Sequence, residues 1–359
     1  MRPVTSCACP RVNEAAPLVG ENVITKFFLR AGLGLAAALL LVGGAQAAET
    51  AVKIGILNTS ARGAVFVAIE KGYFAAEGIA PELVVFDAAQ PIAVAAVTDA
   101  IDFGVDGVTA ALYTLAGQGA LRIIAGCVRE MPGFHTTAFI ASNAAYEAGL
   151  RTVKDMPGHT VAISQRGSAY QYALNLLGLK YGFTLDKLQI TAVQSLPNIA
   201  SAVAGGKTNA GVLNAALTLP LVAKGDIKLL SWVGDETPWQ TAAVWTSAKT
   251  ANGRRDLVER FLRAYKKGAR DFHDAFTGPN ESRADQPTAP EIAGLLAKYL
   301  KLTPAQIQSG ISYHDPEARF DMRDLRRQLD WYEAQGLMKG TLDAEAVVDR
   351  HYLVELPER

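Results

Sequence analysis

The sequence predicts an α/β protein of two lobes, each a mainly parallel sheet flanked by helices, with a ligand cleft between them. From residue 52 onward, apolar stretches of strand length alternate with stretches of helical periodicity, an order typical of parallel βαβ units. This pattern restarts about 107 residues later, counted from Lys53 to Thr160. A chain of 359 residues is also longer than one ordinary domain, which favours two lobes.

The first unit alternates regularly between strands and helices. A polar turn follows its first strand and opens a helix in which Gly72 and Gly78 permit two consecutive helix ends. Strands are expected at 52–57, 82–87, 101–105, 122–127 and 136–141, with helices near 61–76, 90–99 and 107–118.

The second unit begins with a Pro-Gly turn and a strand that ends at Ser164. The helix at 167–181 follows, with its apolar side chains on one side. We expect the chain to cross between the lobes at 139–143 and again at 234–241, where a strand near 241–246 returns it to the first lobe. Further strands are expected at 189–194, 210–213 and 228–233, alternating with helices at 197–205 and 215–224.

The rest of the chain is predicted to be helical. The segment 277–288 is rich in Gly, Pro, Asn, Ser and charged residues, which indicates an exposed loop. Helices are expected at 253–276, 289–300, 303–310, 321–335 and 343–350. Residues 48–141 together with 241–359 are therefore assigned to lobe 1 with the C-terminal helices, and residues 142–240 to lobe 2.

The N-terminus has the three parts of a secretory signal peptide. Lys26 and Arg30 supply positive charge, and small residues ending at Ala47 allow cleavage after that residue. The apolar stretch 31–42 is too short for the roughly 20 residues that span a bilayer. We therefore expect residues 1–47 to be removed and the mature protein to reside in the periplasm. The segment ahead of the charged region is long for such a signal, so either that region is extended or translation starts further downstream.

Charge and cysteine content exclude several classes of protein. Cleavage after Ala47 removes four basic and two acidic residues from 35 of each, which leaves 31 and 33 and a net charge of −2. A nucleic-acid partner is not expected, because the sequence shows no basic patch. Cys127 is the only cysteine after residue 47, so no intramolecular disulfide can form. Its apolar surroundings predict a small core residue.

The sequence predicts neither a metal site nor catalytic residues. The five histidines show no H-x₃-H or HExxH spacing, and no cysteine pair has metal-binding spacing. The sequence also contains no G-x-S-x-G nucleophile elbow and no phosphate-binding G-x-x-x-x-G-K-[ST] loop. No cofactor is therefore expected.

Three segments together resemble one known family. They are EKGYF with EGI at 70–79, VKDMPGHTVAIS at 153–164, and the tail segments 313–317 and 329–337. In this order, they resemble bacterial ABC-transporter solute-binding proteins of the nitrate, sulfonate, taurine and thiamine-pyrimidine-precursor (NMT1-like) type. The resemblance covers roughly residues 50–350.

This resemblance implies a two-lobed periplasmic binding protein of type II that is not an enzyme. Such a monomer captures a small anionic or heteroaromatic ligand (a sulfonate, nitrate, an aromatic carboxylate or a pyrimidine) by hinge closure and delivers it to an ABC permease at the inner membrane. The alternative is a secreted enzyme of the same fold, either a hydrolase or a pyrimidine-precursor synthase. Fungal synthases that share this fold use pyridoxal phosphate and a cysteine-rich motif, and this chain has no such cysteine cluster.

The ligand site is expected where strands end and helices begin, because ligands of open parallel sheets bind beyond the carboxyl ends of the strands. Polar turns occupy five such positions, at 58–60, 87–90, 106–109, 164–169 and 213–215. Helix capping alone explains any one of them, so the prediction rests on their convergence in one cleft. The candidate ligand-binding residues are Asn58, Thr59, Ser60, Asp87, Gln90, Asp106, Thr109, Glu130, His135, Gln165, Arg166, Gly167, Ser168, Asn214 and Trp239.

An anionic ligand is expected at the helix that starts at Gly167. Its free N–H groups, its dipole and the Ser168 hydroxyl all favour negative charge, and Arg166 could add to them. The linker at 129–135, which contains Glu130 and His135, is a second candidate wall. Trp239 lies beside the return crossing, where it either stacks on a planar ligand or packs in the hinge.

Overall fold

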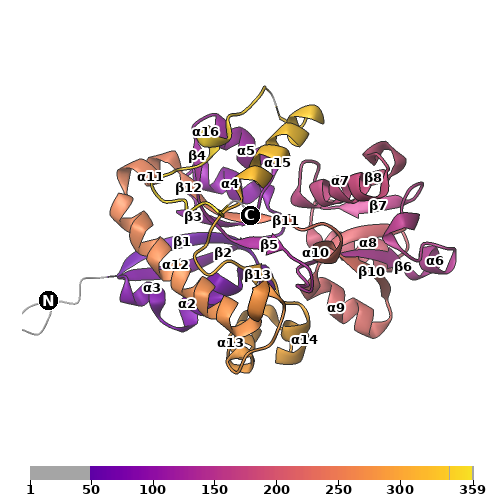
Figure 1. Cartoon of the computed structure of the whole chain (residues 1–359), viewed down its shortest axis with the longest axis horizontal. Helices are drawn as coiled ribbons and strands as arrows, with labels where there is room; N and C mark the ends of the chain where they lie inside the picture. The colour runs from indigo at the N-terminus through magenta and orange to yellow at the C-terminus, as the bar shows by residue number, and fades with distance from the viewer. Residues whose placement is uncertain (1–48, 339, 358–359) are drawn as a thin grey trace, which may run out of the picture. The chain divides into compact units, whose positions relative to one another are not determined.

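The fold is built mainly from two five-stranded sheets flanked by helices (Figure 1). The computed structural model describes residues 49–338 and 340–357. The signal peptide expected at 1–47 lies outside these residues. None of the helices in the described ranges combines the length and apolar character that crossing a membrane requires.

The first sheet has the strand order β2-β1-β3-β12-β4. β1 runs parallel to β2 and β3, whereas β12 runs antiparallel to β3 and β4. β1 and β2 pair over their whole length, from Thr50 opposite Ile79 to Leu57 opposite Phe86. The strands are β1 (Thr50–Leu57), β2 (Ile79–Phe86), β3 (Phe103–Gly107), β4 (Leu121–Gly126) and β12 (Ala242–Ser247).

The second sheet repeats this order as β8-β7-β9-β6-β10. β7 runs parallel to β8 and β9, and β6 runs antiparallel to β9 and β10. The strands are β6 (Thr137–Ser142), β7 (Thr160–Ile163), β8 (Gln189–Ala192), β9 (Ala210–Asn214) and β10 (Ile227–Trp232). In both sheets, one antiparallel strand joins four that share a direction, so the predicted α/β class with two mainly parallel sheets is confirmed.

Helices flank both sheets. Those next to the first sheet are α2 (Gly63–Glu70), α3 (Tyr73–Ala76), α4 (Gln90–Val97), α5 (Ala110–Gly117), α11 (Ala248–Gly253) and α12 (Arg255–Phe276). Those of the second are α6 (Asn143–Glu147), α7 (Ala169–Tyr181), α8 (Leu196–Ala204), α9 (Ala215–Lys224) and α10 (Val233–Glu236). The C-terminal part adds α13 (Ala289–Leu300), α14 (Pro304–Ser309), α15 (Met322–Ala334) and α16 (Ala344–Val347). Single 3₁₀ turns lie at η1 (Ser60–Arg62), η2 (Val153–Asp155), η3 (Leu185–Lys187) and η4 (Pro279–Glu281).

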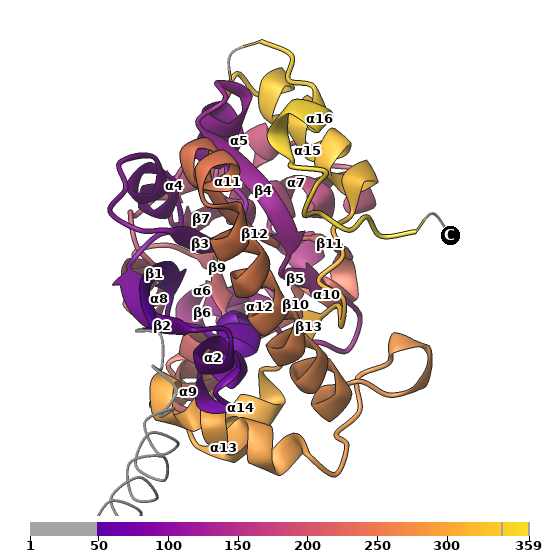
Figure 2. The same cartoon turned by 90° about the vertical axis from the view of Figure 1, so that its left-hand side faces the viewer.

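Glycines set the geometry of the first lobe at two kinds of position. Gly72 directly precedes α3 and Gly78 follows it, with positive φ values of 69° and 66°. They lie at the two consecutive helix ends that the sequence predicts. α12 packs closely against α2 (Figure 2). A Cβ at Gly268 would lie 2.2 Å from the backbone oxygen of Ala64, so only glycine permits this approach.

A small third sheet joins the two lobes and differs from the prediction. It has the order β11-β5-β13, formed by β5 (Val128–Glu130), β11 (Trp239–Gln240) and β13 (Tyr313–His314). These two- and three-residue strands are too short to show a sequence period, so they were not expected.

The first crossing between the sheets lies earlier than expected. The prediction of a crossing at 139–143 is wrong, because most of these residues lie inside β6 and pair with β9 and β10 of the second sheet. The chain instead crosses at 131–136, between β5 and β6. The return between β10 and β12 includes the expected segment 234–241. We therefore propose a boundary of lobe 2 before β6 instead of after residue 141.

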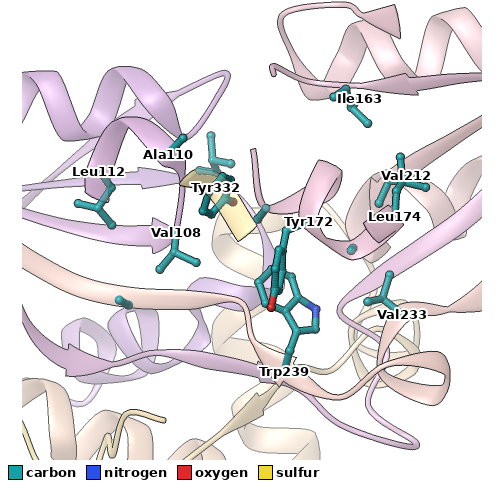
Figure 3. Packing of buried hydrophobic residues seen from close by; sticks show 14 of the residues in the cluster. Val108, Ala110, Leu112, Ile163, Tyr172, Leu174, Val212, Val233, Trp239 and Tyr332 are labelled. Carbon is teal, nitrogen blue, oxygen red and sulfur yellow. The ribbon is translucent and has the colours of Figure 1, made fainter. Parts of the chain in front are cut away.

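An aromatic cluster packs α7 of the second lobe against the hinge and α15 (Figure 3). The ring centroid of Tyr172 lies 4.9 Å from that of Trp239 and 5.2 Å from that of Trp331. Tyr332 continues the cluster to Tyr113 of α5 at 5.7 Å. The core is thus continuous between the lobes on this side.

Candidate functional site

A cavity of about 60 Å³ lies where the carboxyl ends of strands from both sheets meet. The ends of β1, β3, β7 and β9 contribute to it, as the position of ligand sites in open α/β sheets predicts. Its polar lining from the first lobe comprises Thr59, Arg62, Asp106 and Thr241. The second lobe and the first crossing contribute Thr136, Thr137, Ser164, Ser168, Tyr170 and Asn214.

Three direct hydrogen bonds close the two lobes over this cavity. Gln90 Nε2 donates to the backbone oxygen of Arg166 at 2.6 Å. The backbone N–H of Ala110 donates to the oxygen of Gly167 at 2.9 Å, and that of Leu196 donates to the oxygen of Asp87 at 3.4 Å. The structure therefore represents a closed arrangement of the lobes.

Gly167 is required for this closure. Its φ is 73°, and a Cβ at this position would lie 2.8 Å from the Cβ of Ala110 across the cleft. A side chain would therefore strain the backbone and push α5 away.

Arg62 supplies the positive charge of the site. It ends the 3₁₀ turn after β1 and is 4% exposed. Nη1 donates to Cys127 Sγ at 3.6 Å, while Nε has no hydrogen-bond partner among the described residues. Burial lowers the pKa of Arg62, but the negative charge of Asp106 and smaller contributions outweigh it, so the pKa is raised overall. The guanidinium is therefore charged.

Asp106 is fixed at the end of β3 by two backbone groups. It is 2% exposed. Oδ2 accepts the N–H of Leu57 at 2.6 Å, and Oδ1 accepts the N–H of Gly107 at 2.6 Å. These bonds tie the carboxyl ends of β1 and β3 together and hold the carboxylate beside the cavity.

Ser168 presents its hydroxyl to the cavity instead of capping its helix. It is the N-cap residue of α7, but its side chain makes no capping bond. Its Oγ is buried and has no partner in the described part of the chain, as is also true of Thr136 Oγ1. The N–H of Gly167 is already bound by Gln171 Oε1 at 2.7 Å. The hydroxyl of Ser168 is thus available to a ligand, whereas the N–H of Gly167, which was expected to be free, is not.

Tyr170 and Asn214 form the opposite wall. Asn214 Oδ1 caps α9 by accepting the N–H of Leu217 at 3.0 Å. Burial and the charges of Asp106 and Glu130 raise the pKa of Tyr170, and the side chain of Asn214 lowers it in part. Both residues are therefore neutral hydrogen-bonding groups at neutral pH.

Glu130 ends β5, directly before the first crossing between the sheets, and is not among the residues that line the cavity. It is fully buried, and its strand β5 pairs with Trp239 of β11. Burial raises the pKa of Glu130 to about 8, and neither of its carboxyl oxygens has a hydrogen-bond partner among the described residues. The carboxyl group is therefore mostly protonated at neutral pH.

Other predicted residues have structural contacts elsewhere. Ser60 Oγ donates to the oxygen of Gly310 at 2.8 Å, Asn58 Nδ2 donates to that of Tyr299 at 2.9 Å, and Thr109 Oγ1 caps α5. His135 stacks on Trp232 at 4.5 Å. The residues Asp87, Gln90, Gln165, Arg166 and Gly167 lie at the mouth of the cleft or in the contacts that close it.

The structure thus brings Thr59, Asp106, Ser168 and Asn214 of the predicted set together around one cavity. Trp239 packs on Tyr172 in the hinge and does not line the cavity. Sequence reasoning missed Arg62, Thr136 and Tyr170, and it gave Ser164 only as the first residue of a predicted polar turn. One signal could have identified Arg62, because it is the single charge in the apolar run 61–69 that follows the polar turn.

Among the residues described, no group of three or more His, Cys, Asp or Glu side chains could hold a metal ion. The cavity therefore offers hydrogen bonds and one buried cation to a ligand.

Comparison with protein families finds a match to the NMT1/THI5-like family over residues 60–281. Comparison with curated proteins finds no match.

Solved structures share the fold at low sequence identity. A zinc-bound ligand-binding component of an ABC-type import system from Staphylococcus aureus is 11% identical, with a TM-score of 0.69 over 85% of this chain and 98% of that chain. The alkanesulfonate-binding protein SsuA from Xanthomonas axonopodis pv. citri, bound to MOPS, is 18% identical, with a TM-score of 0.67 over 84% and 99%. The nitrate-binding protein NrtA from Synechocystis PCC 6803 is 14% identical, with a TM-score of 0.66 over 84% and 86%.

Proposed function

The chain belongs to the NMT1/THI5-like family, and from that premise we propose that it is the periplasmic solute-binding component of an ABC importer. The observation that carries this proposal is the closed cavity between the two lobes, whose lining includes buried polar groups without partners in the described residues. Solved proteins of the same fold also support this proposal. They are named as a ligand-binding component of an ABC-type import system, an alkanesulfonate-binding protein and a nitrate-binding protein.

Binding is proposed to act through hinge closure. Arg62 and Asp106 belong to the first lobe, whereas Ser168 and Asn214 belong to the second. A ligand that contacts both sets bridges the lobes and favours the closed state of an existing equilibrium. The segments 131–136 and 233–241 connect the sheets and are the proposed hinge.

Within the proposed classes of sulfonate, nitrate, aromatic carboxylate and pyrimidine, the lining favours an anion. A buried guanidinium without an ion pair in the described residues requires a negatively charged or strongly accepting partner. Tyr170 is the only aromatic side chain among the described lining residues. A neutral heteroaromatic ring would therefore leave Arg62 unpaired and could stack only on Tyr170 among the described lining residues.

The bound solute is proposed to leave chemically unchanged. Mass spectrometry of the purified protein should identify a small molecule that dissociates on unfolding, and the protein should rebind it with one site per chain. Incubation of that molecule with excess protein should yield no product. Product formation would contradict the binding role and favour the alternative of a secreted enzyme.

Delivery to an inner-membrane permease by a monomer is part of the same proposal. Osmotic shock of expressing cells should release the protein with the periplasmic fraction, and its mass in size-exclusion chromatography with light scattering should be that of one chain. Retention in the cytoplasm would exclude the transport role.

A further inference from the structure

We propose that the Arg62–Asp106 pair makes the cleft selective for singly charged over doubly charged oxyanions. Arg62 is the counter-ion of the ligand, and Asp106 rejects a second negative charge. This inference deepens the proposed function and rests on it. The ligand head group that it names is a carboxylate or a sulfonate, which share one negative charge and closely spaced oxygens.

Arg62 needs a partner that the folded chain does not supply. Its side chain is almost fully buried, and a 3.6 Å contact with the sulfur of Cys127 is its one hydrogen bond within the described ranges. A guanidinium has five N–H donors, and leaving a buried charge unpaired is costly. Two oxygens of one ligand head group would satisfy it in a bidentate arrangement.

Asp106 is close to Arg62 without neutralising it directly. Its charge raises the pKa of Arg62, yet no carboxylate oxygen lies within 4.0 Å of the guanidinium in the described part of the chain. The bonds from the N–H groups of Leu57 and Gly107, both 2.6 Å long, hold the carboxylate in place. It can therefore neither swing onto Arg62 nor turn away from a ligand.

The rest of the lining offers no second positive charge. Among the described lining residues, Arg62 is the only cation, and the second lobe contributes hydroxyl, amide and phenol groups. Arg166 of that lobe is exposed and takes part in closure through its backbone oxygen. A monoanion therefore balances Arg62, whereas the second charge of a dianion would be buried near Asp106 without a partner.

Three small probes test this selectivity in the wild-type protein. Propionate and ethanesulfonate carry one charge, and ethyl phosphate changes from one charge to two at a second pKa of about 6. In calorimetric titrations after ligand removal, ethanesulfonate should bind at both pH 5 and pH 8, and propionate should bind at pH 8, where it is fully ionised. The affinity of ethyl phosphate relative to ethanesulfonate should fall by about a hundredfold between these pH values. Taking this ratio cancels the titration of the protein's own groups.

A matched pair of variants assigns the selectivity to Asp106. Asp106→Asn should raise the affinity for ethyl phosphate at pH 8 by about tenfold or more relative to ethanesulfonate. Asp102→Asn is the control, because Asp102 Oδ2 also accepts a β1 backbone N–H, that of Lys53 at 2.9 Å, but lies away from the cavity. This control should retain the wild-type ratio. If Asp106→Asn does not fold, the pH dependence of the wild-type ratio decides.

An equal affinity ratio at pH 5 and pH 8, an unchanged ratio in Asp106→Asn, or no binding of either monoanion would overturn this inference. A failure of this inference can be distinguished from a failure of the proposed function. If a neutral solute co-purifies and rebinds, the binding role stands and the charge selectivity fails. If no solute co-purifies and none binds, the binding role itself fails.

Discussion

The two lobes share a strand order but contribute different chemistry to the cleft. The first lobe provides a buried cation and a buried carboxylate, Arg62 and Asp106, both at strand ends under well-packed helices. The second lobe provides neutral groups, including Ser168, Tyr170 and Asn214, from the start of α7 and the end of β9. Under the proposed function, the first lobe sets the charge of the ligand, and the second lobe closes over it and completes its hydrogen bonds.

Removing the cation should have the largest effect. Arg62→Gln should weaken binding of an anionic ligand by about 4 kcal/mol, close to a thousandfold, because it deletes one partner of a buried charge pair. Calorimetric titration measures this loss. Arg122→Gln is the matched control, because Arg122 donates to the backbone oxygens of Ala116 and Leu121 and lies outside the cavity. Equal losses in both variants would show that Arg62 has no specific role in binding, and would contradict the assignment of the ligand's charge to the first lobe.

Glu130 tests whether a buried carboxyl group beside the hinge is protonated. Its pKa of about 8 in the folded protein exceeds the ordinary value of 4.5, so the folded state binds more protons than the unfolded state between these values. The free energy of unfolding should therefore fall by about 3 kcal/mol in total from pH 5 to pH 8 through this group. Glu130→Gln should remove this part of the slope in denaturant titrations.

The charges near Glu130 come from several elements. Asp235 of α10 raises its pKa, and the side chain of Thr137 of β6 lowers it in part. An Asp235→Asn variant should therefore retain most of the slope, because burial is the largest cause of the shift. A slope that is equal in the wild type and Glu130→Gln would show that the buried carboxyl group of Glu130 is ionised in the folded protein at neutral pH.

Ser168 tests the contribution of the second lobe. Ser168→Ala should weaken anion binding by about tenfold, because a hydrogen bond to a charged group is worth about 1.5–3 kcal/mol. Ser168→Asp should weaken it further, since it places a negative charge beside the ligand, although aspartate caps helices well. Affinity that is retained in Ser168→Asp would show that this hydroxyl does not face the anion.

Cys127 should have the smallest effect. It is buried beside Arg62, which contacts its sulfur at 3.6 Å, and burial raises the pKa of its thiol. Cys127→Ala and Cys127→Ser should each retain ligand affinity within a few-fold and lose about 1 kcal/mol of stability. Thermal unfolding and calorimetry measure the two quantities separately. A large loss of affinity with the fold intact would place the thiol in the binding machinery.

Much of the fold was predictable because it depends on local signals. The alternation of apolar strands and helices gave both sheets, and Gly72 and Gly78 marked helix ends that require positive φ. The first crossing was not predictable in the same way. β6 is an apolar run whose sequence does not specify its partners, and its residues pair with residues 69 or more positions away.

The candidate site was predictable only where strand ends carry polar turns. Asp106, Ser168 and Asn214 follow this rule and line the cavity. Ser60 and Thr109 follow it equally well, but they bond to backbone groups instead, since capping and ligand binding use the same side chains. Arg62 was missed because its neighbours in the folded chain, such as Asp106, Cys127 and Tyr265, are distant from it in sequence.

The central claim is that a ligand bound by the first lobe stabilises closure of the second lobe over it. Small-angle X-ray scattering of the ligand-free protein, before and after the co-purifying ligand is added back, tests this most directly. The radius of gyration should fall on binding in the wild type, and it should stay at the ligand-free value in Arg62→Gln at the same ligand concentration. An unchanged radius of gyration in wild-type protein that calorimetry shows to be saturated would contradict the claim.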